Sequence, residues 1–215
     1  MSLKDKFLLA GAKLLGLMAQ DQEHHNPVKT VTPGMPELLR EAAASGAILL
    51  ENRVLPLEKG TSVSVFGRVQ LDYFYTGYGS GGDVNYPYAV SLLEGLRACE
   101  ELRVNEELAA VYENWVREHP ADHGVWGLWP RFHPEMPVDA ATVAEARAVS
   151  DQAVIVIGRS SGEDRENTLT EGSYYLTREE RDLLKAVTEQ FPWRLFRFFL
   201  FAREVLCTPF LKKGS

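Results

Sequence analysis

The chain has 215 residues, of which 45% are hydrophobic and 25% charged, and its formal net charge is −7. This composition is that of an ordinary globular protein with room for one sizeable domain. The acidic balance argues against nucleic acid as a partner, because phosphate binding needs a basic face, and no apolar run is long enough to span a bilayer. The two cysteines, Cys99 and Cys207, have no metal-binding or disulfide spacing. We therefore expect a cytoplasmic protein with reduced thiols, no metal and no cofactor.

Residues 1–32 are expected to form an N-terminal helix and a linker. The apolar stretch 7–19 places four residues on one helical face: Leu8, Ala12, Leu15 and Ala19. Two lysines precede this stretch, as they do in a signal peptide. However, Lys13 interrupts the run and no convincing cleavage site precedes Gln20. The pattern therefore favours an amphipathic helix.

Residues 33–191 alternate between helical and extended patterns. Helices are predicted over 36–50, 90–100, 106–118, 140–150 and 177–190, and the last begins with a capping box at Thr177. Strands are predicted over 61–66 and 153–157. The second is a continuous apolar run, as expected of a buried parallel strand. Strands separated by helices predict an α/β fold with a parallel sheet.

Residues 192–215 differ from the rest in composition. They are aromatic and basic, and Glu204 is their only acidic residue. A third strand rich in valine and isoleucine is expected here, and the composition does not match one. We interpret the segment first as a changed reading frame or a premature end. The alternatives are a basic amphipathic segment that touches a membrane or a partner, and a poorly formed strand.

A loop rich in glycine and tyrosine, residues 71–87, follows the first strand. Its GxGxxG pattern at 77–82 begins about ten residues after the strand and opens no helix, unlike a dinucleotide fingerprint. The loop can instead be a flexible surface loop or the rim of a sugar site. In a sugar site, the rings of Tyr73, Tyr75 and Tyr78 would lie against pyranose faces. From this region we assign six residues to substrate binding: Arg68, Asp72, Tyr78, Ser80, Asp83 and Asn85.

A second polar loop, residues 158–167, follows the buried strand. Ligands gather at the carboxyl ends of strands in open α/β sheets, so both loops lie where a site is expected. Glu163 is flanked by Gly162 and Asp164, with Arg159 and Arg165 nearby. A neighbouring carboxylate raises the pKa of a carboxyl and an arginine lowers it, so the sequence does not give the sign of a shift on Glu163. A solvated acidic loop is the simpler alternative.

Several of these segments together resemble glycoside hydrolase family 3. The resemblance lies in Arg40–Asn52 with Leu55-Pro-Leu57, Val65-Phe-Gly-Arg68, the Gly77–Asn85 loop, and Ile155–Arg165 through Glu171-Gly-Ser173. It covers roughly residues 33–191 and implies a three-layer α/β sandwich with a mainly parallel sheet, here incomplete. Members of the family are mostly β-glucosidases, β-xylosidases and related exo-acting enzymes on β-linked sugars.

The resemblance also implies roles for individual residues. Retaining glycosidases need two carboxylates about 5–5.5 Å apart. The family nucleophile is an aspartate from a (β/α)₈ barrel, which takes about 250 residues and is absent here. The sandwich domain commonly lends the acid/base glutamate, and the Ser-Gly-Glu-Asp-Arg stretch makes Glu163 the candidate. Arg159, Asp164 and Arg165 are then expected to bind substrate. The domain order resembles members in which the barrel follows the sandwich.

Three hypotheses follow for function. The first is a fragment of a retaining β-glycosidase that is inactive alone, and the second is a non-catalytic sugar-binding domain. The third is an adaptor that binds a membrane or a partner through residues 192–215. The expected partners are a β-linked glycoside and either a barrel-containing chain or a second copy; nucleic acid is not expected.

Overall fold

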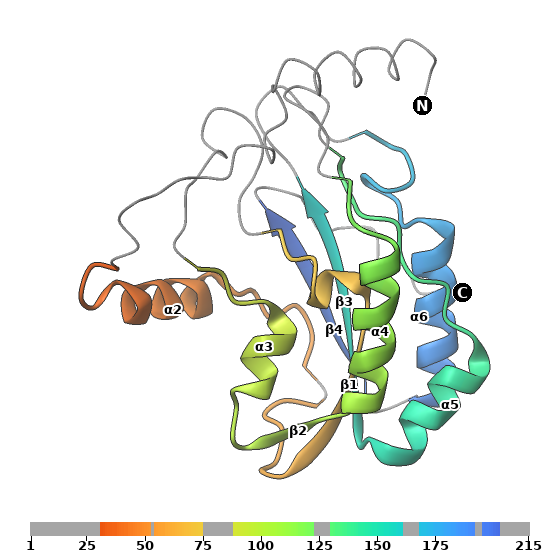
Figure 1. The fold of residues 1–215 in the computed structure, drawn as a ribbon, viewed down its shortest axis with the longest axis horizontal. Coiled ribbons are helices and arrows are strands. Elements are labelled where there is room, and N and C mark those ends of the chain that lie inside the picture. The colour runs from red at the N-terminus through yellow and green to blue at the C-terminus, as the bar shows by residue number, and fades with distance from the viewer. Residues whose placement is uncertain are drawn as a thin grey trace.

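A computed structural model describes residues 31–52, 54–74, 88–122, 130–160, 168–191 and 195–202, the last for its backbone only. It contains a parallel sheet in the order β2-β1-β3-β4 (Figure 1). The strands are β1 (Thr61–Phe66), β2 (Leu102–Val104), β3 (Gln152–Ser160) and β4 (Leu195–Ala202). The α/β class and the parallel sheet predicted from the sequence are confirmed. The predicted N-terminal helix lies outside the described residues.

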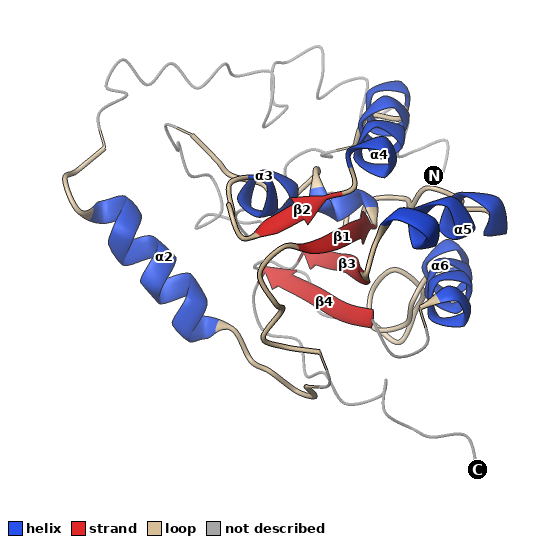
Figure 2. Cartoon of the chain, turned by 90° about the horizontal axis from the view of Figure 1, so that it is seen from below, coloured by secondary structure: helices blue, strands red, loops and turns tan. Residues whose placement is uncertain are grey.

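Helices lie on both sides of the sheet, which makes three layers. They are α2 (Met35–Gly46), α3 (Leu92–Arg97), α4 (Glu106–Glu118), α5 (Ala140–Val149) and α6 (Arg178–Gln190). Viewed nearly along the strands, α5 and α6 lie on one side of the sheet and α2 on the other (Figure 2). None of the helices in the described part of the chain is long and apolar enough to cross a membrane.

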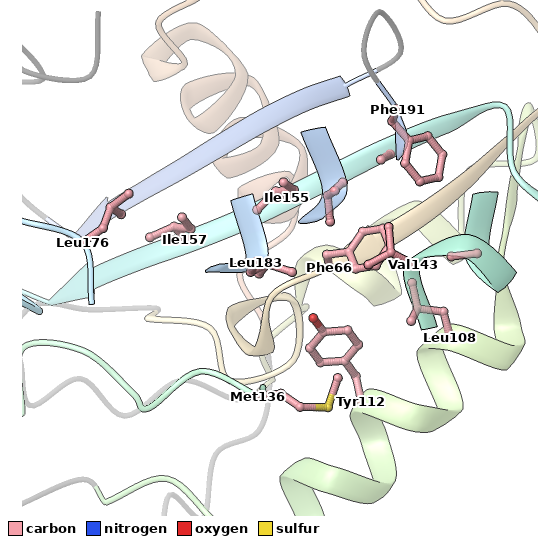
Figure 3. Close-up of a cluster of buried hydrophobic side chains, with 13 residues drawn as sticks. Phe66, Leu108, Tyr112, Met136, Val143, Ile155, Ile157, Leu176, Leu183 and Phe191 are labelled. Carbon is pink, nitrogen blue, oxygen red and sulfur yellow. The ribbon is translucent and has the colours of Figure 1, made fainter. Parts of the chain in front are cut away.

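Alternate residues of β1 and β3 enter two separate cores. Phe66, Ile155 and Ile157 pack against α4, α5 and α6 (Figure 3). Val65 and Val156 face the second core, which includes Leu93 of α3. Because successive side chains of a strand point to opposite faces, a continuous apolar strand such as β3 must be covered on both sides.

The helix boundaries follow local capping signals. Thr177 accepts a hydrogen bond from the backbone N–H of Glu180, whose carboxylate accepts one from the N–H of Thr177, so the predicted capping box is confirmed. Ser91 and Glu94 form a second capping box, which starts α3 later than predicted. Helix α2 ends at Gly46, four residues before the predicted end, and the chain continues in an extended conformation at Ala47.

Two strands were missed from the sequence. Strand β2 is only three residues long, too short to show an alternating pattern, and pairs with β1 from Thr61↔Leu102 to Val63↔Val104. Strand β4 pairs with β3 over eight positions, from Ala153↔Leu195 to Ser160↔Ala202. The expectation that no third strand follows the last helix is therefore wrong. Phenylalanine, like valine and isoleucine, is enriched in strands, so an aromatic sequence can form β4.

Candidate active site at the carboxyl ends of β1 and β3

Arg68 follows β1 directly, at the start of the short 3₁₀-helix η1 (Arg68–Gln70). Its guanidinium is buried and donates to Asp72 Oδ2 at 2.9 and 2.5 Å and to the carbonyl oxygens of Pro134 and His119, both at 2.9 Å. It also lies 5.0 Å from the centre of the Trp115 ring. Its side chain therefore points into the protein and positions Asp72, and the assignment of Arg68 to substrate binding stays a prediction.

Arg159, near the end of β3, is also directed inward. Its guanidinium forms a two-pronged ion pair with Glu180, with both N–O distances 2.6 Å, and donates to the carbonyl oxygen of Ser173 at 3.1 Å. Both members of the ion pair are buried. This guanidinium joins the end of β3 to the first turn of α6, and the expected substrate contact of Arg159 stays a prediction.

The irregular segment 130–136, called the strap below, contacts the residues on both sides of positions 161–167. The backbone N–H of Ser160 donates to the carbonyl of Arg131 at 2.8 Å, and the Ser160 hydroxyl donates to that of Pro130 at 2.5 Å. The Arg131 guanidinium donates to the hydroxyl of Thr168. Residues 161–167, which include Glu163, lie outside the described residues. Ser160 and Thr168, on either side of them, both form hydrogen bonds with the strap.

The strap also contacts the start of the first loop. Glu135 accepts hydrogen bonds from the backbone N–H of Arg68, with N–O distances of 3.1 and 3.0 Å, and the ring of His133 stacks on Phe74 at 4.5 Å. Phe74 is the last described residue before the 75–87 gap. The strap therefore joins the carboxyl ends of β1 and β3, the two places where the sequence predicted the loops of a site.

Burial raises the pKa of the Glu135 carboxyl to about 7. Hydrogen bonds from the backbone N–H groups of Arg68 and Met136 oppose this rise, and the charge of Glu180 adds to it. The neighbouring Tyr112 hydroxyl is buried, and burial raises its pKa well above the ordinary value. The strap is thus held by a carboxyl that titrates near neutrality and has no cation hydrogen-bonded to it among the described residues.

Seven of the predicted site residues lie outside the described residues: Tyr78, Ser80, Asp83, Asn85, Glu163, Asp164 and Arg165. Among the described residues, no group of three or more His, Cys, Asp or Glu side chains could hold a metal ion. The role of the strap was missed, because an irregular run with prolines and no periodicity gives no sequence signal for contacts with residues 30 to 67 positions away.

The chain has relatives of known activity. The model of the glycosyl hydrolase family 3 C-terminal domain matches residues 47–195. A β-glucosidase of Ruminococcus albus is 42% identical over 157 residues, which cover 72% of this chain and 16% of the relative. β-Glucosidase A of Butyrivibrio fibrisolvens is 34% identical over 180 residues, covering 72% of this chain and 21% of the relative.

Two solved structures are similar to the chain. That of a β-glucosidase from Paenibacillus barengoltzii matches with a TM-score of 0.78 and 44% identity, over 83% of this chain and 20% of that one. β-Glucosidase 3B of Thermotoga neapolitana, solved in complex with α-D-glucose, matches with a TM-score of 0.66 and 31% identity, over 76% of this chain and 24% of that one. The chain therefore spans less than a quarter of the length of these relatives.

Proposed function

Because the chain belongs to glycoside hydrolase family 3, we propose that it forms one side of the active site of a retaining β-glycosidase, with Glu163 as general acid/base. The observation that carries the proposal is the strap, which ties the described flanks of the Glu163 loop to the end of β1. A catalytic carboxyl is effective only when its support is rigid, because an error of about 1 Å costs about a hundredfold in rate.

In this proposal, Glu163 protonates the glycosidic oxygen as the bond to the leaving group breaks. It later removes a proton from the water that attacks the glycosyl-enzyme intermediate. The nucleophilic carboxylate comes from polypeptide outside the region shared with the relatives. That region is between 16% and 24% of the relatives' length. Asp72, Asp83 and Asn85 would bond sugar hydroxyls, and Tyr78 would stack on a pyranose face.

The test is hydrolysis of 4-nitrophenyl β-glucoside by the isolated chain. We expect no turnover above that of a Glu163→Gln variant, because no second carboxylate is supplied to attack the anomeric carbon. Co-purification with a barrel-containing glycosidase, together with activity that disappears in the Glu163→Gln variant, would support the assigned role. Turnover by residues 1–215 alone that Glu163→Gln abolishes would contradict the need for a carboxylate from outside this region.

A second candidate is a sugar-binding domain without catalysis, and the glucose complex of the Thermotoga relative supports its sugar-binding part. It predicts weak, saturable binding of glucose by the isolated chain, measured by titration calorimetry. Tyr78→Ala should weaken binding by about tenfold, because one stacking contact contributes on the order of 1 kcal/mol. Val111→Ala on the outside of α4 is the control. No glucose binding at millimolar concentration would exclude this candidate.

A further inference from the structure

The strap is attached to the sheet near each of its two ends. Pro130 and Arg131 accept hydrogen bonds from Ser160 at the end of β3, and Glu135 accepts from the backbone N–H of Arg68 after β1. No residue of the strap belongs to a helix or a strand. A segment without regular backbone hydrogen bonds opens locally at a lower cost than the strands of a sheet do. The strap is therefore a unit that can separate from the sheet before the sheet unfolds.

The hydrogen bonds of the buried Glu135 carboxyl suit a neutral acid. Its Oε1 accepts from the backbone N–H of Met136 at 2.8 Å and from that of Arg68 at 3.1 Å, whereas Oε2 only shares the Arg68 donor, at 3.0 Å. Both donors therefore reach one oxygen, and the other oxygen can carry a proton without losing either bond. A carboxylate has about four acceptor positions, so two donors among the described residues leave the charged form poorly satisfied.

The charged groups around Glu135 oppose one another. The charge of Arg68, on η1, favours the carboxylate, but this guanidinium is already paired with Asp72. The charge of Glu180, on α6, favours the neutral acid, and Glu180 is itself paired with Arg159 of β3. These pairs leave burial as the main influence on the proton of Glu135.

Two further titratable side chains lie close to this carboxyl. Tyr112 comes from α4, and burial raises the pKa of its hydroxyl well above the ordinary value, so it stays neutral at physiological pH. His133 lies two positions earlier in the strap, and its ring stacks on that of Phe74. The hydroxyl of Tyr112 therefore adds no counter-charge for an ionised Glu135.

We propose that the strap is a proton-dependent clasp, closed on the ends of β1 and β3 while Glu135 holds a proton and shifted toward a separated state when that proton passes to solvent. Separation returns the carboxylate to water, which hydrates its charge. The pKa of Glu135 is about 7 in the closed strap against an ordinary value of 4.5. Proton binding therefore favours the closed state fully below pH 4.5, and this preference is lost as the pH rises through about 7. The inference does not depend on what the two loops bind.

The clasp links two positions that share no titratable group. The backbone N–H of Ser160 donates to the carbonyl oxygen of Arg131, at the opposite end of the strap from Glu135. If the strap separates as one unit, this bond breaks together with the bonds of Glu135. Exchange of the Ser160 amide therefore reports the protonation of a carboxyl to which it is not bonded.

The test is amide hydrogen exchange of the full chain at pH 5 and pH 8, measured by NMR and corrected for the intrinsic exchange rates. Protection of the Arg68, Met136 and Ser160 amides should fall together, on the order of a hundredfold. The amide of Ile155, inside β3, should remain better protected than these three at both pH values, because the sheet persists when the strap separates. Protection of Ser160 that does not change with pH, or of all three amides, overturns the proposal.

Two variants identify the carboxyl responsible. Glu135→Gln keeps an oxygen that accepts from both N–H groups and removes the titration, so the protection of Ser160 should become equal at pH 5 and pH 8. Glu101→Gln changes an exposed carboxyl directly before β2, at the opposite end of the parallel sheet, and should keep the wild-type pH dependence. Wild-type pH dependence in Glu135→Gln overturns the proposal.

A further measurement on the wild-type chain needs no substitution. The amide proton shifts of Arg68 and Met136 are followed from pH 4 to pH 9. A single common midpoint near neutrality supports the clasp, because one carboxyl accepts from both amides. Separate midpoints, or a common midpoint below pH 5, overturn it.

Discussion

At the scale of single residues, the Glu135 carboxyl has a pKa well above that of a free glutamate side chain. This carboxyl accepts hydrogen bonds from the backbone N–H groups of Arg68 and Met136, the latter at 2.8 Å, in a site closed to solvent. Burial costs the charged carboxylate more hydration free energy than these two hydrogen bonds return, so the pKa rises to about 7. The contact between the strap and β1 therefore contains a proton-binding group.

We predict that folding stability falls as pH rises from about 4.5 to about 7, because the folded chain holds a proton on Glu135 that the unfolded chain has released. The loss is on the order of 3 kcal/mol. Urea unfolding at pH 5 and pH 8 measures it. Glu135→Gln should flatten the dependence, since its amide oxygen can still accept from both N–H groups. Glu171→Gln, which alters an exposed ion pair, should not.

An equal pH dependence in wild type and Glu135→Gln would show that Glu135 does not govern stability near neutrality.

At the scale of elements, the close approach of β1 to β3 depends on Gly67. This residue directly follows β1 with a φ of 101°, and a Cβ there would lie 2.1 Å from the carbonyl oxygen of Val156. Gly60 has a similar φ of 84° but open space around the same position. An alanine at either position has the strain of a positive φ, but only an alanine at Gly67 also clashes with a neighbouring strand.

We predict that Gly67→Ala lowers the free energy of unfolding by at least about 3 kcal/mol, and that Gly60→Ala lowers it by about 1 kcal/mol. The first value includes displacement of β3, whereas the second reflects only the positive φ. Equilibrium urea unfolding of both variants gives the comparison. Similar losses for the two variants would mean that β3 accommodates the added methyl group without strain.

Local patterns determined some elements better than others. The predicted strand 61–66 and helix 106–118 match β1 and α4, because β-branched alternation and an Asn105 cap are read from adjacent residues. Strand β4 was missed because its assignment depends on pairing with β3 rather than on a valine-rich composition. The apolar face of the helix predicted over 36–50 was visible in the sequence, but its exposure was not.

At the scale of the whole molecule, the sheet ends at β4, whose outer edge has no partner strand among the described residues. An open edge is a site for pairing with another chain. The net charge of −7 opposes association of two copies at long range.

The sequence by itself determined the α/β class, the limits of most helices, the family, and the two loops in which the site is sought. These depend on periodicity, caps and short motifs, all of which are properties of neighbouring residues. Only the tertiary structure decided that Arg68 and Arg159 point inward and that the strap joins β1 to β3. The bond from Arg68 to Glu135 spans 67 positions of the chain, and such a contact exists only once the sheet has formed.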